Sequence, residues 1–189
     1  MAPQGDKKEE ILDAMLELVV ERGFHNAPMS LLAKRSGASP GVMYHYFPSK
    51  EALIHALYLR VKLAKRQVLL QGYSPQVSPQ QAFLNIWINA YHFYRTQSRE
   101  TRFLDLYENS SFSKHHPTEQ TSSQDAARAH FLKIFRAKKA GGLLKDLPQA
   151  AIDELSFGLA ARLAKRDEAI KPAMLKKIAE AAWKALAAD

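Results

Sequence analysis

Cysteine is absent from this chain of 189 residues, and its absence excludes disulfides and thiolate metal sites. No run approaches the roughly 18 apolar residues that a membrane-spanning helix needs, and the charged N-terminus has no signal-peptide core. The chain also lacks a glycine-rich phosphate loop, a nucleophile elbow, and histidines and carboxylates at metal-ligand spacing. These absences predict a cytoplasmic protein that is not an enzyme and holds no cofactor and no metal.

Strand patterns are missing as well, and apolar residues recur at helical spacing throughout. Ile11, Met15 and Leu18 form one such stripe, in a helix that Asp6 and Glu9 are expected to cap. The fold class expected is therefore all-α, with about nine helices. They are expected at about 7–22, as two short helices within 28–48, and at about 50–71, 79–97, 99–111, 123–140, 148–166 and 172–187.

One stretch of the chain contains no acidic residue, which suits a polyanionic partner. The net charge is +8, and residues 22–50 contain four cations (Arg22, Lys34, Arg35 and Lys50) and no acid. The preceding helix is acidic, so its outer face is expected to point away from phosphate. A second basic block is interpreted as a solvated helix face. It consists of Arg128, Lys133, Arg136, Lys138, Lys139 and Lys145, against Asp125 and Asp146.

The stretch 28–50 has the pattern of two short helices joined by a tight turn. Ala33 lets a second helix cross closely, and Gly37 accepts the left-handed turn conformation. Ser39 is placed to cap the second helix and Pro40 suits its first position, whereas Pro48 ends it. A helix of about two turns is not stable alone. With polar aromatic residues facing outward, the pattern predicts a helix-turn-helix.

Over residues 11–57 the chain resembles the DNA-binding domain of TetR-family transcriptional regulators. The matching residues are Gly23-Phe24, Leu32-Ala33, Gly37-Ala38-Ser39, Gly41, Met43-Tyr44-His45-Tyr46-Phe47 and Ser49-Lys50-Glu51-Ala52-Leu53. The resemblance implies a three-helix DNA-binding domain at 1–50 and a helical bundle at 51–189 that binds an effector and dimerises. It also implies a ligand-responsive repressor that binds double-stranded DNA as a homodimer at a palindromic operator.

The candidate DNA contacts lie on the second helix of the motif, at both of its ends and, at Ser30, in the first turn of the first helix. Tyrosine hydroxyls and a lysine ammonium suit phosphate oxygens, and a glycine lets the backbone approach DNA. Pro28 stands where the family usually has a capping hydroxyl, and Ser30 is expected to substitute for it. The set is Ser30, Ser39, Pro40, Gly41, Val42, Tyr44, His45, Tyr46 and Lys50. Alternatively, Tyr44 and Tyr46 are half-buried packing residues; since two residues that are two apart on a helix cannot face the same way, at least one of Tyr44, His45 and Tyr46 is expected to pack. Met43 and Phe47 are expected to face inward.

Aromatic residues of the second half form either a helical core or an effector pocket. The set is Phe83, Trp87, Tyr91, Tyr94, Phe103, Tyr107, Phe131 and Phe135. Asn85, Asn89, His92 and Arg102 are the polar residues that could anchor a small molecule in such a pocket. No spacing identifies the ligand.

The last two helices have broad apolar faces that either complete the core or pair with a second copy. Small residues interleaved with leucines allow close helix approach, and the family resemblance favours the dimer. The expected interface is Ile152, Leu155, Leu159, Leu163, Met174, Ile178 and Ala182.

The polar stretch 113–122 is expected to be a mobile loop, and its pair His115-His116 lacks the further ligands of a metal site. Two other functions stay open. One is a non-specific or architectural DNA-binding protein without an effector, which a C-terminal domain lacking a cavity would favour. The other is an enzyme or small-molecule carrier, which turnover of a bound compound would reveal.

Overall fold

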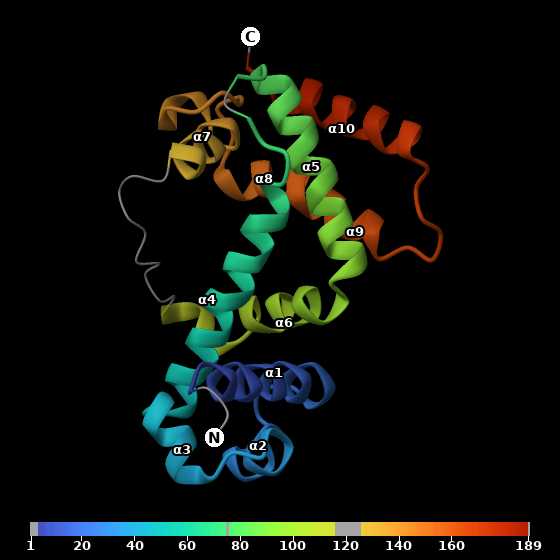
Figure 1. Ribbon diagram of the computed structural model, residues 1–189. Helices are drawn as coiled ribbons and strands as arrows, with labels where there is room; N and C mark the ends of the chain where they lie inside the picture. The colour runs from blue at the N-terminus through green and yellow to red at the C-terminus, as the bar shows by residue number, and fades with distance from the viewer. Residues whose placement is uncertain (1–3, 75, 116–125, 189) are drawn as a thin grey trace. The chain divides into compact units, whose positions relative to one another are not determined.

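The computed structural model describes residues 4–74, 76–115 and 126–188, and within these ranges the chain is helical (Figure 1). Its segments are α1 (Gln4–Arg22), α2 (Met29–Ser36), α3 (Pro40–Tyr46), α4 (Lys50–Leu69), α5 (Pro79–Thr96), α6 (Ser98–Glu108), η1 (Ser111–His115), α7 (Ala126–Ile134), η2 (Lys138–Ala140), α8 (Gln149–Asp153), η3 (Glu154–Gly158), α9 (Leu159–Ala164) and α10 (Pro172–Leu186). Since α8, η3 and α9 are contiguous, the described residues form nine longer helices. The all-α prediction is confirmed.

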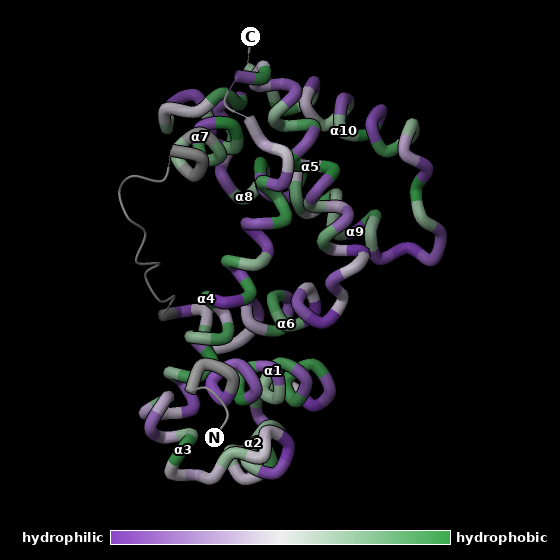
Figure 2. Tube along the Cα trace, viewed as in Figure 1, coloured by the Kyte–Doolittle hydropathy of each residue, from purple (hydrophilic) through white to green (hydrophobic). Residues whose placement is uncertain are grey.

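The chain divides into two compact units that α4 and the α5–α6 junction connect. Unit 1 comprises Met1–Ala64 and Gln97–Glu119, and unit 2 comprises Lys65–Thr96 and Gln120–Asp189. Helix α6 therefore folds with the N-terminal helices, although it follows α5 in the sequence. Figure 2 shows hydrophobic and hydrophilic residues alternating along α1 and α10, as expected of helices with one buried face. None of the described helices is both long and apolar enough to cross a membrane.

Helix α1 supplies the centre of unit 1. Its stripe of Ile11, Met15 and Leu18 is fully buried, and Gly23 ends the helix with a positive φ of 74° and a backbone bond to the carbonyl of Val19 at 2.8 Å. These features match the prediction. The start does not, because the helix begins at Gln4, so Asp6 lies inside it and is not the N-cap residue.

An aromatic cluster joins α6 and η1 to the rest of unit 1. The ring of Phe24 lies 5.9 Å from Phe103, 6.5 Å from Tyr107 and 5.1 Å from Phe112. Tyr107 stacks on Tyr58 of α4 at 4.0 Å. This cluster and the packing of α6 against α1 place α6 on the side of α1 that faces away from α2 and α3 (Figure 1).

Helix α5 is the most buried element of unit 2. Phe83 and Trp87 are fully buried, and Phe83 stacks on Phe135 with ring centroids 4.9 Å apart. The indole nitrogen of Trp87 donates to the carbonyl of Ser156 at 2.9 Å. Ser156 lies in the π-helical turn η3, which interrupts the helix expected at 148–166 and gives this carbonyl a partner outside its own helix.

The helix expected at 123–140 ends earlier, at Ile134. A tight turn follows, in which Leu144 donates to the carbonyl of Arg136 at 3.0 Å and Lys138 donates to the carbonyl of Leu144 at 2.7 Å. These bonds replace the helical ones, so Gly141 closes η2 and not a long helix.

The loop expected at 113–122 is wrong for its first residues, because 113–115 belong to η1. Residues 116–122, His116 among them, lie outside the described ranges.

Candidate nucleic-acid interface

The turn between α2 and α3 has the conformation that the sequence predicted. Gly37 ends α2 with φ 62° and ψ 17°, in the left-handed region that glycine adopts at little cost. The buried Ser36 hydroxyl donates to the carbonyl of Leu32 at 2.8 Å and accepts from the amide of Ala38 at 3.3 Å. The buried hydroxyl of Ser36 thus has both a donor and an acceptor partner within the turn.

Hydrogen bonds at both ends stabilise helix α3. Ser39 is the N-cap and accepts from the amide of Val42 at 3.4 Å, while Pro40 occupies the first helical position. At the other end, Phe47 donates its amide to the carbonyl of Met43 at 2.9 Å. Met43 and Phe47 are 1% and 3% exposed, as predicted. These two apolar side chains attach a seven-residue helix that could not persist alone.

The opposite face of α3 is open. Tyr44 is 53% exposed and Val42 38% exposed, two of the few large apolar side chains of the described residues that remain on the surface. His45 is also exposed, whereas Tyr46 is half-buried, with its ring 5.4 Å from His45 and 6.3 Å from Phe47. The packing alternative therefore applies to Tyr46 and not to Tyr44.

No residue that the structure describes packs closely against Gly41. A Cβ atom placed on it would meet no heavy atom within 4 Å, and its φ is not positive. Gly41 and Pro40 are both exposed at the start of α3, so the surface beside the helix N-terminus is accessible. Such a surface permits close approach of an anionic backbone to the first amides of the helix.

Lys50 lies at the start of α4 and is only partly exposed. Its ammonium donates to the carbonyl of Phe24 at 2.7 Å. An ammonium has three donors, so one bond inside the protein leaves capacity for a phosphate. Lys50 thus connects α4 to the turn after α1.

The start of α2 lacks a side-chain cap, as its sequence implied. Pro28 is the N-cap residue, and no side chain caps the helix. The amides of Leu31 and Leu32 both bond to the carbonyl of Pro28 at 3.1 Å. Ser30 lies in the first turn with an exposed side chain, so its hydroxyl is accessible to an external partner.

An ion-pair cluster modifies the predicted basic window. Arg35 donates to Glu21 at 2.7 Å and lies 3.8 Å from Glu17, which also pairs with Arg99 of α6 at 3.1 Å. The hydrogen bond from Arg35 is the main cause that holds the pKa of Glu21 below its usual value. The acidic face of α1 thus neutralises part of the window. Sequence reasoning missed this because the partners lie far apart in the chain.

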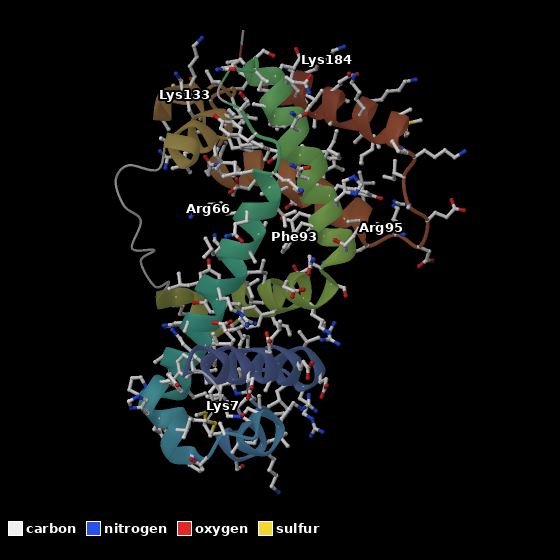
Figure 3. All side chains as sticks on the ribbon, viewed as in Figure 1. Lys7, Arg66, Phe93, Arg95, Lys133 and Lys184 are labelled. Atoms are coloured by element: carbon white, nitrogen blue, oxygen red, sulfur yellow. The ribbon has the colours of Figure 1, made fainter. Side chains whose placement is uncertain are left out.

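A second contact that sequence reasoning missed holds the end of α2. The ammonium of Lys7 bonds to Glu10 at 2.7 Å and to the carbonyl of Ser36 at 3.2 Å (Figure 3). A cation at the C-terminus of a helix stabilises its exposed carbonyls. No local signal connects Lys7 with a turn 29 residues away.

The predicted effector set divides between the two units. Phe103 and Tyr107 belong to the aromatic cluster of unit 1. Phe131 and Phe135 lie in unit 2, where Phe157 packs on both at 6.1 and 4.6 Å. Phe83, Trp87, Tyr91 and Phe135 are buried, whereas Phe131 and Tyr94 are half-buried. Tyr94 accepts a hydrogen bond from Lys65 at 2.7 Å.

The polar residues that were expected to anchor an effector mostly have partners within the protein. Asn89 donates to the carbonyls of Leu69 and Gln71, and Asn85 accepts from Gln81 at 2.7 Å. Arg102 lies in unit 1, where it donates to the carbonyl of Val20. Only His92 is exposed without a side-chain contact to another element.

A surface hollow of about 660 Å³ lies over the connection between α9 and α10, away from these aromatic residues. Lys165, Lys171 and Met174 are among its lining residues. Arg95 holds this connection in place by donating to the carbonyls of Ala164, Arg166 and Asp167 (Figure 3). Within the described residues no group of histidines and carboxylates could hold a metal ion.

The residues expected at a dimer interface differ in exposure. Leu155 and Met174 are 48% and 53% exposed, and Leu159, Leu163 and Ile178 are half-buried. Ile152 and Ala182 are buried inside unit 2, at 0% and 6% exposure. We therefore assign these two to the core, since side chains this deeply buried within one protomer offer no surface to a second copy.

The N-terminal and the C-terminal part of the chain both match known protein families. Residues 11–57 match the family of bacterial regulatory proteins called the tetR family, and residues 79–187 match a tetracyclin repressor-like C-terminal domain. The transcriptional regulator UidR of Escherichia coli K12 is 47% identical over 53 residues, which are 28% of this chain and only 27% of that protein. The regulator BetI of Escherichia coli K12 is 28% identical over 163 residues, 84% of this chain and 78% of BetI.

Solved structures agree in fold. A TetR-family transcriptional regulator from Haemophilus influenzae Rd superposes with a TM-score of 0.74 at 23% identity, over all of both chains. One from Marinobacter aquaeolei VT8 has a TM-score of 0.78 at 20% identity, over 98% of this chain and 97% of that one. At these identities the likeness concerns the fold alone.

Proposed function

The chain belongs to the TetR family of DNA-binding transcriptional regulators, and we propose that it is a repressor that binds a palindromic operator as a homodimer and releases it when an effector binds. The family consists of regulators and not of enzymes. The resemblance inferred from residues 11–57 is thereby confirmed. The dimer, the operator and the effector are parts of the proposal, as are the individual DNA contacts and a cytoplasmic location.

The observation that carries the proposal is the open face of α3. A capped, seven-residue helix is held by Met43 and Phe47 and presents Tyr44 and His45 outward. Among the described residues, packing covers only about half of Tyr44, and no close neighbour requires a glycine at residue 41. A duplex placed against this face explains both, because tyrosine hydroxyls bond to phosphates and a glycine lets the backbone approach.

Tyr44→Ala tests this assignment in a gel-shift titration with DNA from the gene's own upstream region. We expect roughly tenfold weaker binding, the usual cost of losing one good contact, and an unchanged melting temperature. Leu63→Ala is the matched control, since Leu63 is 47% exposed in the same unit but lies on α4. Equal binding by Tyr44→Ala and wild type would disprove the assignment.

The proposed effector site lies in the aromatic region of unit 2, around Phe131, Phe135 and Phe157. Binding there regulates DNA affinity only if the effector prefers one conformation of the protein over another. Helix α4 supports such coupling, because it begins at the end of the helix-turn-helix and continues into unit 2. The same gel shift, repeated with candidate small molecules, tests it: an effector must weaken operator binding and raise the melting temperature of the free protein.

Competition with unrelated DNA distinguishes the repressor from a non-specific or architectural binder. A specific regulator typically prefers its operator by about 10³-fold or more. A preference below about tenfold would favour the architectural alternative.

A further inference from the structure

The short helix α2 ends without the kind of backbone bond that closes α1. At the end of α1, Gly23 donates its amide to the carbonyl of Val19 at 2.8 Å. Gly37 ends α2 in a similar left-handed conformation, but among the residues that the structure describes its amide makes no backbone bond to α2. The last carbonyls of such a helix need partners from outside the helix.

Two side chains act at this end of α2. The hydroxyl of Ser36 accepts from the amide of Ala38 at 3.3 Å. The ammonium of Lys7 donates to the carbonyl of Ser36, the last residue of α2, at 3.2 Å. The same ammonium would lie 3.8 Å from a Cβ placed on Gly37, and no other described heavy atom beyond the chain neighbours of Gly37 comes within 4 Å. Lys7 therefore lies directly over the turn that leads to α3.

The position of Lys7 is unfavourable for its own helix. Lys7 lies in the first turn of α1, where the helix dipole favours a negative charge. Glu10, one turn further on, accepts from the ammonium at 2.7 Å and offsets part of this cost. At the C-terminus of α2 the same cation is favourable, because the terminal carbonyls carry partial negative charge. The contact with α2 thus accounts for a lysine at this position better than the stability of α1 does.

The turn after α2 connects the position of Ser36 to that of α3. Only residues 37–39 separate the two helices. Ala38 is buried, with 4% of its surface exposed, and Ser39 is the N-cap of α3. A displacement of the Ser36 carbonyl therefore also displaces the start of α3, since a turn of three residues with defined conformations cannot absorb it.

We propose that Lys7 is a positioning residue for sequence recognition, which holds the end of α2 and thereby keeps α3 in the orientation that contacts the bases of the operator. This inference rests on the proposed function of α3 and adds to it a residue outside the helix-turn-helix. Contacts with bases depend on orientation, whereas attraction to phosphates depends mainly on charge. Loss of Lys7 is therefore expected to lower the preference for the operator and to leave binding to unrelated DNA almost unchanged.

The test compares Lys7→Met with Lys8→Met in the full chain. Lys8 is the next residue, is exposed, and makes no hydrogen bond or ion pair with the described residues, so both variants lose one charge and only Lys7→Met loses the contact. The operator probe is the duplex that the wild-type protein enriches from a random-sequence pool, and the second probe is an unrelated duplex of equal length. We expect Lys7→Met to bind the operator about five- to tenfold more weakly, the factor that one hydrogen bond from a charged group contributes, and Lys8→Met to bind like wild type.

Two further measurements distinguish positioning from a direct contact with DNA or a general loss of stability. A lysine bonded to a phosphate would lower the log–log salt slope by about 1 and weaken both probes equally, whereas the slope of Lys7→Met is expected to stay that of Lys8→Met. Hydrogen exchange of the amides of residues 37–39 should become faster in Lys7→Met than in Lys8→Met, with exchange in α5 unchanged. Lys7→Arg keeps the cation and is expected to restore most of the operator affinity.

Operator binding by Lys7→Met that equals that of wild type or of Lys8→Met would overturn the proposal. Equal losses on both probes, a reduced salt slope, or exchange that quickens throughout the chain would do the same, because each assigns Lys7 a different role. Tyr44→Ala tests the DNA-contacting face of α3 separately. A wild-type protein that enriches no sequence would refute the proposed function itself, and this inference with it.

Discussion

The ammonium of Lys50 has a partner inside the protein as well as a proposed one on DNA. Its bond to the carbonyl of Phe24 at 2.7 Å connects α4 to the turn after α1. Lys50→Met keeps the length of the side chain but removes the charge and all three donors. We expect it to lower the free energy of unfolding by about 1 kcal/mol, a typical net value for one hydrogen bond, and to weaken DNA binding.

Chemical denaturation combined with the gel shift distinguishes the two roles of Lys50. Tyr44→Ala is the comparison, since it is expected to affect DNA binding alone. If Lys50→Met had the same free energy of unfolding as wild type, the bond to Phe24 would not contribute to stability. Unchanged DNA binding would remove Lys50 from the proposed interface.

Residues whose contacts are local could be predicted from the sequence, and those with distant partners could not. The conformation of Gly37, the Ser39 cap and the inward direction of Met43 and Phe47 follow from spacing within ten residues. The pairing of Arg35 with Glu21 depends on how α1 crosses α2. Tertiary packing alone determines that crossing.

At the scale of a helix, the start of α4 is stabilised by its first residues. Ser49 accepts from the amide of Ala52 at 3.1 Å. Glu51 bonds to its own backbone amide and to the Ser49 side chain, and these bonds lower its pKa below the usual value. A lowered pKa in the folded state means stability that is present above the unfolded-state pKa and is lost as pH falls through the folded-state pKa.

Glu51→Gln is therefore expected to lower the melting temperature near neutral pH, and this deficit is expected to disappear at an acidic pH below the folded-state pKa of Glu51, where the carboxyl group is as uncharged as the amide of Gln. The effect is small because the carboxyl group is solvent-exposed. Thermal unfolding followed by circular dichroism at both pH values measures it. Glu108→Gln is the control, because Glu108 is the last residue of α6 in the same unit, and it should show no such loss. A deficit that persists at low pH would refute the assigned role.

Helix positions were predictable because apolar spacing is a local property, whereas two interruptions were not. Residues 135–140 have helical composition, yet their backbone bonds to Leu144, which in turn lies against the end of α10. The π turn at η3 exposes the Ser156 carbonyl to Trp87, which is 69 residues away. In the first case bonds to Leu144 replace helical ones, and in the second the Ser156 carbonyl accepts from Trp87 in addition to the amide of Leu159 in its own helix.

At the scale of the whole chain, the sequence places the helix-turn-helix but not the grouping of helices. Helix α6 belongs to unit 1 because Phe103 and Tyr107 pack on Phe24, a contact that no spacing reveals. The predicted functional division at residue 50 concerns which segments bind DNA and which bind the effector, and it stays a prediction. The distribution of charge also depends on packing. Residues 22–50 contain no acid, but Glu21 of α1 neutralises part of this window by pairing with Arg35.

The proposed homodimer can be tested by a substitution on the surface that is expected to pair. Among the large apolar side chains that stay exposed, Leu155 and Met174 lie on the two C-terminal helical faces expected to pair. Burying a leucine is worth about 1.5–3 kcal/mol, and a two-fold interface contains each residue twice. Leu155→Glu would place two unpaired carboxylates there and is expected to shift the protein from dimer to monomer in light scattering. Leu63→Glu, an equally exposed leucine on α4, should leave the dimer intact. Since Leu155 is half-exposed, the variant protomer keeps its core, so a dimer that survives this substitution would mean that the two copies pair through another surface.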